Sequence, residues 1–244
     1  LGVMLFYLDK FYRVRNWTYL ELICVLFSAY LIFTIKSYIL FSFLPTVLLW
    51  YAVNFIRDIR SVVLKLIIAP LLLITGVLLS AFVFIQFTKV DTKYSLQNIG
   101  ETARVTSNDL AFGSGRGAGS TYVLGELDGS LESMIRLFPA AVNATLFRPY
   151  FWEVSNPFML VAAFESFLIL ILTLYALYRI RLFNIDPFIL FCLIFSVVFG
   201  FAIGVSIFYF GTLMRYKFPI IPFYMAALIL IIGKYDSSLK ESLK

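Results

Sequence analysis

The sequence predicts an all-α integral membrane protein, with six transmembrane helices, the end of a truncated N-terminal helix and a helical extracytoplasmic domain. The first observation is composition, since 61% of the residues are hydrophobic, 14% are charged and the mean hydropathy is +0.93. Soluble domains carry about 25% charged residues. The second observation is that apolar runs recur near the length of about 20 residues that a helix needs to cross roughly 30 Å of hydrocarbon.

These apolar runs divide the chain into three parts. Residues 1–87 hold three full spans after the run LGVMLFYL, which is too short to cross a membrane and is expected to end a helix that begins upstream. Residues 88–157 form the extracytoplasmic domain, and residues 158–244 hold three more spans and a tail. The predicted spans are residues 17–35, 37–56, 66–87, 158–178, 187–210 and 218–233.

Basic residues in the short connections predict the orientation, because cytoplasmic loops carry an excess of Lys and Arg. One side holds most of these residues, whereas the other holds only Lys36, Arg215 and Lys217. We therefore expect a multi-pass membrane protein with a cytoplasmic C-terminus and with residues 88–157 and 211–217 outside. The basic side contains Lys10, Arg13, Arg15, Arg57, Arg60, Lys65, Arg179, Arg181, Lys234, Lys240 and Lys244.

Composition also excludes several kinds of chemistry. The sequence contains no histidine, so it supplies no His-ligated metal and no Ser-His or Cys-His nucleophile. Cys24 and Cys192 lie in apolar runs, where thiols behave as small hydrophobes, and they indicate no disulfide and no metal site. The net charge of +6 comes mostly from residues beside apolar runs, so membrane lipids rather than nucleic acid are the expected surroundings.

The extracytoplasmic domain contains six basic and seven acidic side chains with apolar residues between them. This mixture favours a segment that folds against the membrane surface. Leu96, Ile99 and Ala103 have helical spacing and predict a short amphipathic helix.

A glycine-rich loop follows, GSGRGAGSTYVLG, with Arg116 near its middle. A mobile surface lid is the favoured interpretation, and a phosphate cradle made of backbone N–H groups is the alternative. The sequence requires no cofactor. A divalent cation could bind the nearby carboxylates, although their spacing fits no known calcium loop. These carboxylates are Asp109, Glu126 and Asp128.

The end of the domain, DGSLESMIRLFPAAVNATLF, predicts a second helix that lies in the membrane interface. Ser130 is suited to cap its N-terminus, and its apolar face is formed by Leu131, Met134, Ile135 and Phe138. Asn143-Ala144-Thr145 fits the N-glycosylation sequon, which is frequent by chance.

Ser196, Gly200 and Gly204 recur every four residues in the predicted span 187–210. Such small residues let another helix approach closely. Packing within the same chain is the favoured interpretation over a dimer interface, and the oligomeric state stays open.

The segment LFRPYFWEVSNPF carries the densest group of chemically useful side chains, at the mouth of the fourth full span. Arg148, Tyr150, Trp152, Glu153 and Asn156 lie within nine residues. One interpretation is an aromatic belt at the lipid headgroups. The other is a site in which the aromatic rings stack on a sugar while Arg148 holds a phosphate in its planar fork.

Glu165 lies eight residues into a predicted span, about 12 Å along the helix axis. A carboxylate at such a depth costs about 2.5–3.5 kcal/mol, so we expect it to face the bundle interior and to pair with Arg148, Arg215 or Lys217. The pair is either a polar clamp between helices or part of a functional site. Near the last span, Arg215, Tyr216 and Lys217 flank an outward helix start that favours an anion.

The pattern RYKFPIIPF resembles the closing region of multi-span glycosyltransferases of the GT-C type, which use polyprenyl-phosphate sugars. LFRPYFWEVSNPF followed by a span with a glutamate is similar to bacterial cell-envelope polysaccharide proteins of the O-antigen polymerase and ligase group. This resemblance implies a protein of the cytoplasmic (inner) membrane, a lipid-linked sugar donor at the outer face of that membrane and a phosphate-binding role for Arg215. The acidic catalytic residue of the transferases normally lies in a first outer loop, which this sequence does not contain.

The leading hypothesis is transfer or polymerisation of sugars from an isoprenoid-phosphate-linked donor during polysaccharide assembly. Arg148 and Arg215 would bind the phosphate, Tyr150 and Trp152 would stack on the sugar, and Glu153 or Glu165 would act as base or orienting carboxylate. The alternatives are a transporter or flippase with Glu165 in the bundle core, and a noncatalytic scaffold that binds an envelope partner through residues 88–157.

Overall fold

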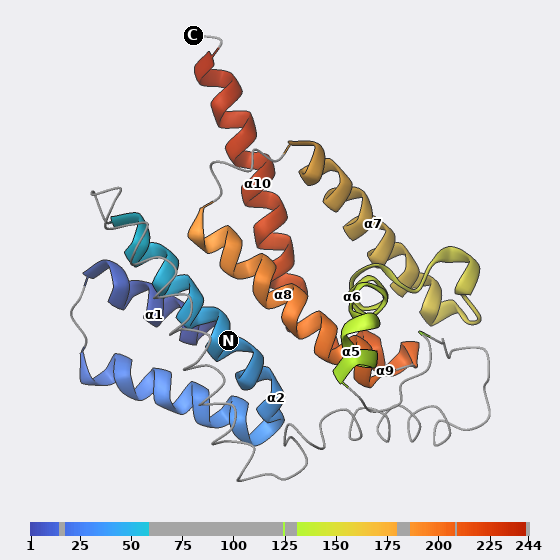
Figure 1. The fold of residues 1–244 in the computed structure, drawn as a ribbon, viewed down its shortest axis with the longest axis horizontal. Coiled ribbons are helices and arrows are strands. Elements are labelled where there is room, and N and C mark those ends of the chain that lie inside the picture. Colours follow the sequence, from blue (N-terminus) through green and yellow to red (C-terminus); the bar gives the residue numbers. More distant parts are fainter. Residues whose placement is uncertain (15–17, 59–123, 125–130, 180–185, 208, 243–244) are drawn as a thin grey trace. The chain divides into compact units, whose positions relative to one another are not determined.

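The computed structural model describes residues 1–14, 18–58, 124, 131–179, 186–207 and 209–242. Every element of regular structure in these residues is a helix (Figure 1), which confirms the predicted all-α class for this part of the chain. Among these described residues, four helices are long and apolar enough to cross a membrane, or five if the bent pair of α9 and α10 is one span. The predicted span 66–87, the helix around Leu96 and the glycine-rich loop lie outside the described residues.

The chain forms two compact units, which are considered separately: residues 1–84 and residues 85–244. The first unit contains α1 (Gly2–Val14) and α2 (Tyr19–Asp58). The helices of the second unit are α5 (Leu131–Arg136), α6 (Phe138–Phe147), the 3-10 helix η3 (Phe151–Glu153), α7 (Pro157–Arg179), α8 (Pro187–Ser206), α9 (Phe210–Tyr216) and α10 (Ile221–Ser242).

Helix α2 is broken at Lys36, whose backbone is extended with φ −155° and ψ 86°. The two halves, Tyr19–Ser37 and Ile39–Asp58, correspond to the first two predicted spans. Figure 1 shows the chain turning back between them. The predicted boundary between these spans is therefore confirmed to within a few residues.

Polar contacts tie α1 to α2 in the first unit. Lys10 forms an ion pair with Glu21, and the Tyr12 hydroxyl donates a hydrogen bond to Asp58 at 2.7 Å. The ring of Tyr12 also contacts Trp50. The end of α1 and both ends of α2 therefore meet, while the break in α2 lies at the other end of the unit.

The core of the second unit lies along α8, which packs against both α6 and α10. Phe191, Phe195 and Phe199 occur every four residues on one face of α8, are buried, and stack on one another. Phe223 of α10 meets this row edge-on. The result is an aromatic ladder that joins two of the candidate spans.

Close packing of α6 on α8 depends on the small residues of α8. A Cβ atom on Gly204 would lie 2.3 Å from the carbonyl oxygen of Ala141, so only glycine permits this approach. The Thr145 hydroxyl donates to the Gly200 carbonyl oxygen at 2.7 Å across the same contact. The predicted packing of the small-residue face within the chain is confirmed.

The helix predicted from Ser130 onward forms as two pieces rather than one. Helix α5 begins at Leu131, and α6 starts anew after Leu137, with Pro139 in its first turn. Proline has no N–H and is tolerated in the first turn of a helix but not in its interior, which explains the restart.

The last two predicted spans differ from the observed helices. Helix α8 ends at Ser206 rather than at residue 210, and residues 211–217, expected as an outer loop, belong mostly to α9. Helices α9 and α10 meet at an angle of 67°. Pro219 and Pro222 lie at this break and explain it, because neither can donate the backbone hydrogen bond that a continuous helix needs.

The break lies inside the second unit rather than at its edge. Tyr224, in the first turn of α10, shares a hydrogen bond of 3.0 Å with Thr173, which lies in the second half of α7. We name the two ends of this unit the Pro157 end, where α7 begins, and the Arg179 end, where α7 finishes. Figure 1 shows α10 running from the middle of the bundle past the Arg179 end.

Candidate functional site

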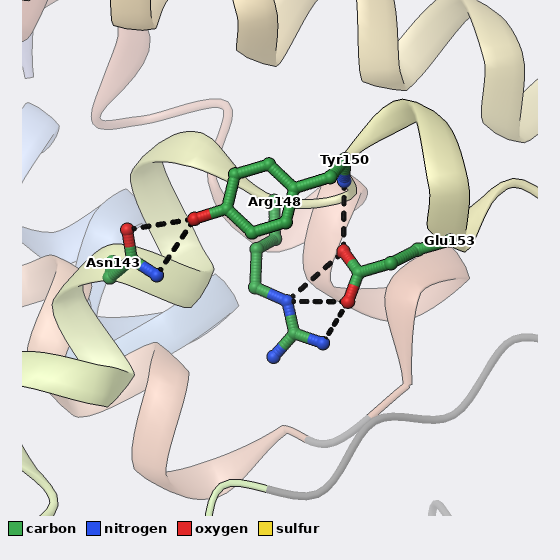
Figure 2. Close-up of polar contacts among 4 residues, drawn as sticks. All are labelled: Asn143, Arg148, Tyr150 and Glu153. Atoms are coloured by element: carbon green, nitrogen blue, oxygen red, sulfur yellow. Dashed lines mark hydrogen bonds and ion pairs between the residues drawn. The ribbon is translucent and has the colours of Figure 1, made fainter.

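The sequence cluster at 148–153 folds as a tight turn between α6 and α7, which we call the Arg148 turn. Glu153 accepts hydrogen bonds from Arg148 Nε at 2.9 and 3.1 Å, and the two side chains form an ion pair (Figure 2). The same carboxylate accepts a 2.8 Å hydrogen bond from the backbone N–H of Tyr150 and caps helix η3. Glu153 therefore holds both the guanidinium and the backbone of the turn in place.

An aromatic pair lies beside this ion pair. The rings of Tyr150 and Trp152 stack with centroids 4.7 Å apart and an interplanar angle of 23°. The Tyr150 hydroxyl is within hydrogen-bonding distance of both polar side-chain atoms of Asn143, 3.0 Å from Nδ2 and 3.1 Å from Oδ1 (Figure 2). Trp152 is 80% exposed. The turn thus presents an open indole surface whose neighbouring tyrosine is oriented by α6.

Three neighbouring helices anchor the Arg148 turn. Arg148 lies over the ring of Phe210 in α9, with its guanidinium carbon 5.3 Å from the ring centroid. Its backbone N–H donates to Ala144 at the end of α6. Its carbonyl oxygen accepts a 3.0 Å hydrogen bond from Ser166 of α7. The turn is therefore held by α6, α7 and α9 together.

Glu165 and Lys217 form an ion pair at the break between α9 and α10, with Lys217 Nζ 3.2 Å from Glu165 Oε1. Lys217 Nζ also donates to Ser166 Oγ at 3.1 Å. The Lys217 side chain is only 3% exposed, whereas that of Glu165 is 42% exposed.

The expected partner for Glu165 is confirmed, since Lys217 was one of the three candidates. The Glu165 side chain is half-exposed, but its Oε1 atom, which faces Lys217, is buried, in agreement with the expectation that the carboxylate faces the bundle interior with a partner. Lys217 is the buried member of the pair, because the bend at the prolines brings the short α9 into the bundle and carries Lys217 with it.

The remaining predicted site residues fall outside this cluster. Arg215 is exposed on α9, and no hydrogen bond or ion pair joins its side chain to any residue that the structure describes. Tyr216 ends α9 and is partly buried. Arg116 and the carboxylates considered for a divalent cation, Asp109, Glu126 and Asp128, lie outside the described residues.

The sequon residues have structural roles in the fold. Asn143 bonds the Tyr150 hydroxyl, and Thr145 is fully buried against α8 with its hydroxyl bonded to Gly200. The pattern is therefore explained by packing of α6.

Two residues that shape the site were not predicted from the sequence. Ser166 is fully buried and links Arg148 to Lys217, yet a single serine in an apolar helix is unremarkable in composition. Phe210 contacts Arg148 but is one of many phenylalanines in the chain. The only available signal for Ser166 was its position next to Glu165.

Comparisons with known proteins assign no family to this chain, so its function is inferred from the geometry of the site. The chain matches no protein-family model, no curated protein and no solved structure.

Proposed function

We propose that the chain binds an isoprenoid-phosphate-linked sugar at the Pro157 end of the second unit and takes part in sugar transfer or polymerisation there. The observation that carries this proposal is the exposed, stacked pair of Tyr150 and Trp152 beside the Arg148 guanidinium. Flat aromatic faces pack against the C–H surface of a sugar ring, and a guanidinium matches the oxygens of a phosphate. Both features lie within one short turn.

In this proposal each residue of the Arg148 turn has a separate role. Trp152 stacks on the sugar, and the guanidinium of Arg148, which Glu153 orients, binds the phosphate. Because both oxygens of Glu153 accept hydrogen bonds, we assign it the role of holding Arg148 and Tyr150 in place rather than the role of base. Arg215, which is exposed on α9, is a second cation for the phosphate.

The reaction itself would be a displacement at the sugar. An acceptor hydroxyl attacks the anomeric carbon, the bond from that carbon to the phosphate oxygen breaks, and the phosphate leaves on the isoprenoid. The acceptor proton passes to a carboxylate. Glu165 is the remaining candidate for this role, since it directly precedes Ser166, whose hydroxyl donates to the Arg148 carbonyl oxygen.

The test is sugar transfer from a labelled polyprenyl-diphosphate N-acetylhexosamine in proteoliposomes that contain the full chain. Arg148→Ala and Arg215→Ala should abolish elongation, and Trp152→Ala should reduce it. Phe158→Ala is the matched control, because Phe158 is 90% exposed at the start of α7. Equal losses in Trp152→Ala and Phe158→Ala would indicate an aromatic belt, and normal glycan in Arg148→Ala or Arg215→Ala would contradict the proposal.

A second candidate function is movement of a lipid-linked substrate across the membrane. The observation that favours it is the buried Lys217 paired with Glu165 at the break between two half-helices. Broken helices with ionisable residues at mid-bundle depth are typical of transporter sites. In this case the wild-type protein in vesicles would move a fluorescent polyprenyl diphosphate from one leaflet to the other without transferring any sugar. Glu165→Gln would stop this movement.

A further inference from the structure

A chain of polar contacts connects the break in the last candidate span to the Arg148 turn. It runs from Glu165 to Lys217, from Lys217 Nζ to Ser166 Oγ at 3.1 Å, and from Ser166 Oγ to the Arg148 carbonyl oxygen at 3.0 Å. Ser166 is fully buried and Lys217 nearly so. The two contacts of Ser166 therefore lie within the packed helices, where competing water is scarce.

The direction in which the Ser166 hydroxyl donates determines how these polar contacts are connected. A serine inside a helix usually donates to the carbonyl four residues earlier in its own helix. Ser196 of α8 does this, with a 2.7 Å bond to Cys192. Ser166 instead donates to Arg148, outside its helix. Because Lys217 Nζ donates to the Ser166 oxygen, it occupies an acceptor position of the hydroxyl and favours the rotamer whose proton points to Arg148.

Lys217 in turn depends on its place in the fold. A buried ammonium needs hydrogen bonds and a counter-charge, and here Ser166 and Glu165 supply them. The bend between α9 and α10 brings Lys217 to this depth. A change in the bend would therefore move Lys217 away from Ser166.

We infer that Lys217 and Ser166 are positioning residues that set the Arg148 turn for its ligand, so that the broken span controls the geometry of the phosphate and sugar site. The functional part of this inference rests on the proposed function. Neither residue touches the ligand; Ser166 holds the backbone that carries the Arg148 guanidinium and precedes the Tyr150 and Trp152 rings. Arg148 and Glu153 would still meet without this support, but in a looser turn.

The first arm of the test needs no ligand. Hydrogen exchange is measured on the full chain in lipid nanodiscs, on peptides that cover residues 148–156, where the Tyr150 N–H is bonded to Glu153. Ser166→Ala should raise exchange there by about threefold to tenfold, the factor that loss of one hydrogen bond produces. Ser196→Ala is the matched control, because Ser196 is equally buried and, among the residues that the structure describes, its hydroxyl bonds only within its own helix.

Lys217→Met gives an independent variant, and the double variant Glu165→Gln with Lys217→Met covers the case in which the single variant fails to fold. Both should raise exchange in residues 148–156 as Ser166→Ala does. Thr173→Val removes a different polar contact between α7 and α10 and should leave the turn unchanged. Equal increases in the control variants, or no increase in Ser166→Ala and the Lys217 variants, would overturn the inference.

The second arm measures affinity for polyprenyl-diphosphate N-acetylhexosamine in the same nanodiscs. Ser166→Ala should weaken binding by about threefold to tenfold while Ser196→Ala does not. If the wild-type chain does not bind this lipid, the proposed function fails, whereas the exchange results still decide whether the turn is positioned by Lys217. If the wild-type chain binds and Ser166→Ala binds equally well, the positioning role fails and the proposed function stands.

Discussion

Replacement of Gly204 by alanine should destabilise the second unit, because the added Cβ would lie 2.3 Å from the carbonyl oxygen of Ala141. Ordinary contact begins at 3.4 Å, so α6 would have to move by about 1.1 Å away from α8. That movement would also stretch the 2.7 Å hydrogen bond from Thr145 to Gly200. Overpacking of this kind costs about 1–3 kcal/mol, and backbone atoms cannot rotate away as a side chain can.

Gly200→Ala is the matched control for this prediction, one helical turn away on the same helix. A Cβ atom there meets nothing closer than 3.8 Å, so the substitution should be neutral or stabilise the helix by about 0.5–1 kcal/mol. The free energy of unfolding is measured by SDS titration in mixed micelles with circular dichroism as the readout. Equal stability of the Gly204→Ala and Gly200→Ala variants would refute the close approach of α6 and α8.

Three further substitutions test the polar contacts. Thr145→Val should lower the free energy of unfolding by about 1 kcal/mol in the same titration, since it removes a buried hydrogen bond. Glu165→Ala should lower the free energy of unfolding by about 3 kcal/mol, because it leaves the buried Lys217 without its counter-charge. This value is the low end for a broken buried ion pair, since Glu165 is 42% exposed. The double variant with Lys217→Met should recover most of the lost stability. Arg148→Lys should weaken binding of a polyprenyl diphosphate, because an ammonium cannot form the planar fork. Unchanged stability in the first two, or unchanged affinity in the third, would contradict these assignments.

The candidate membrane spans were predictable because their signal is local. Hydropathy over about 20 residues depends only on composition, and the halves of α2 on either side of Lys36, together with α7, match the predicted spans to within a few residues. The small residues Gly200 and Gly204 also predicted a close helix contact, since their spacing is visible in one dimension.

The path of the last span was not predictable in the same way. Pro219 and Pro222 were visible in the sequence, but an outer loop before a span and a bent span have nearly the same composition. The energy cost of an isolated charge predicted a partner for Glu165, yet the choice of Lys217 depends on the bend that carries it inward. Ser166 escaped prediction because its role exists only in the tertiary structure.

The local geometry of the Arg148 turn was foreseen only as a list of side chains. Their clustering within nine residues predicted proximity, but the pairing of Arg148 with Glu153 depends on the short helix η3, which Glu153 itself caps. Of the two roles considered for Glu153, base or orienting carboxylate, this pairing favours the orienting one.

The most direct test of the proposed sugar-binding site is the fluorescence of Trp152 in a chain that carries Trp17→Phe and Trp50→Phe, in lipid nanodiscs. Trp152 is 80% exposed, so a sugar that stacks on it should shift and quench its emission. The proposed sugar-binding site predicts a saturable change in Trp152 emission with polyprenyl-diphosphate N-acetylhexosamine and a much smaller change with polyprenyl diphosphate that lacks the sugar. An unchanged Trp152 spectrum with both lipids would contradict it.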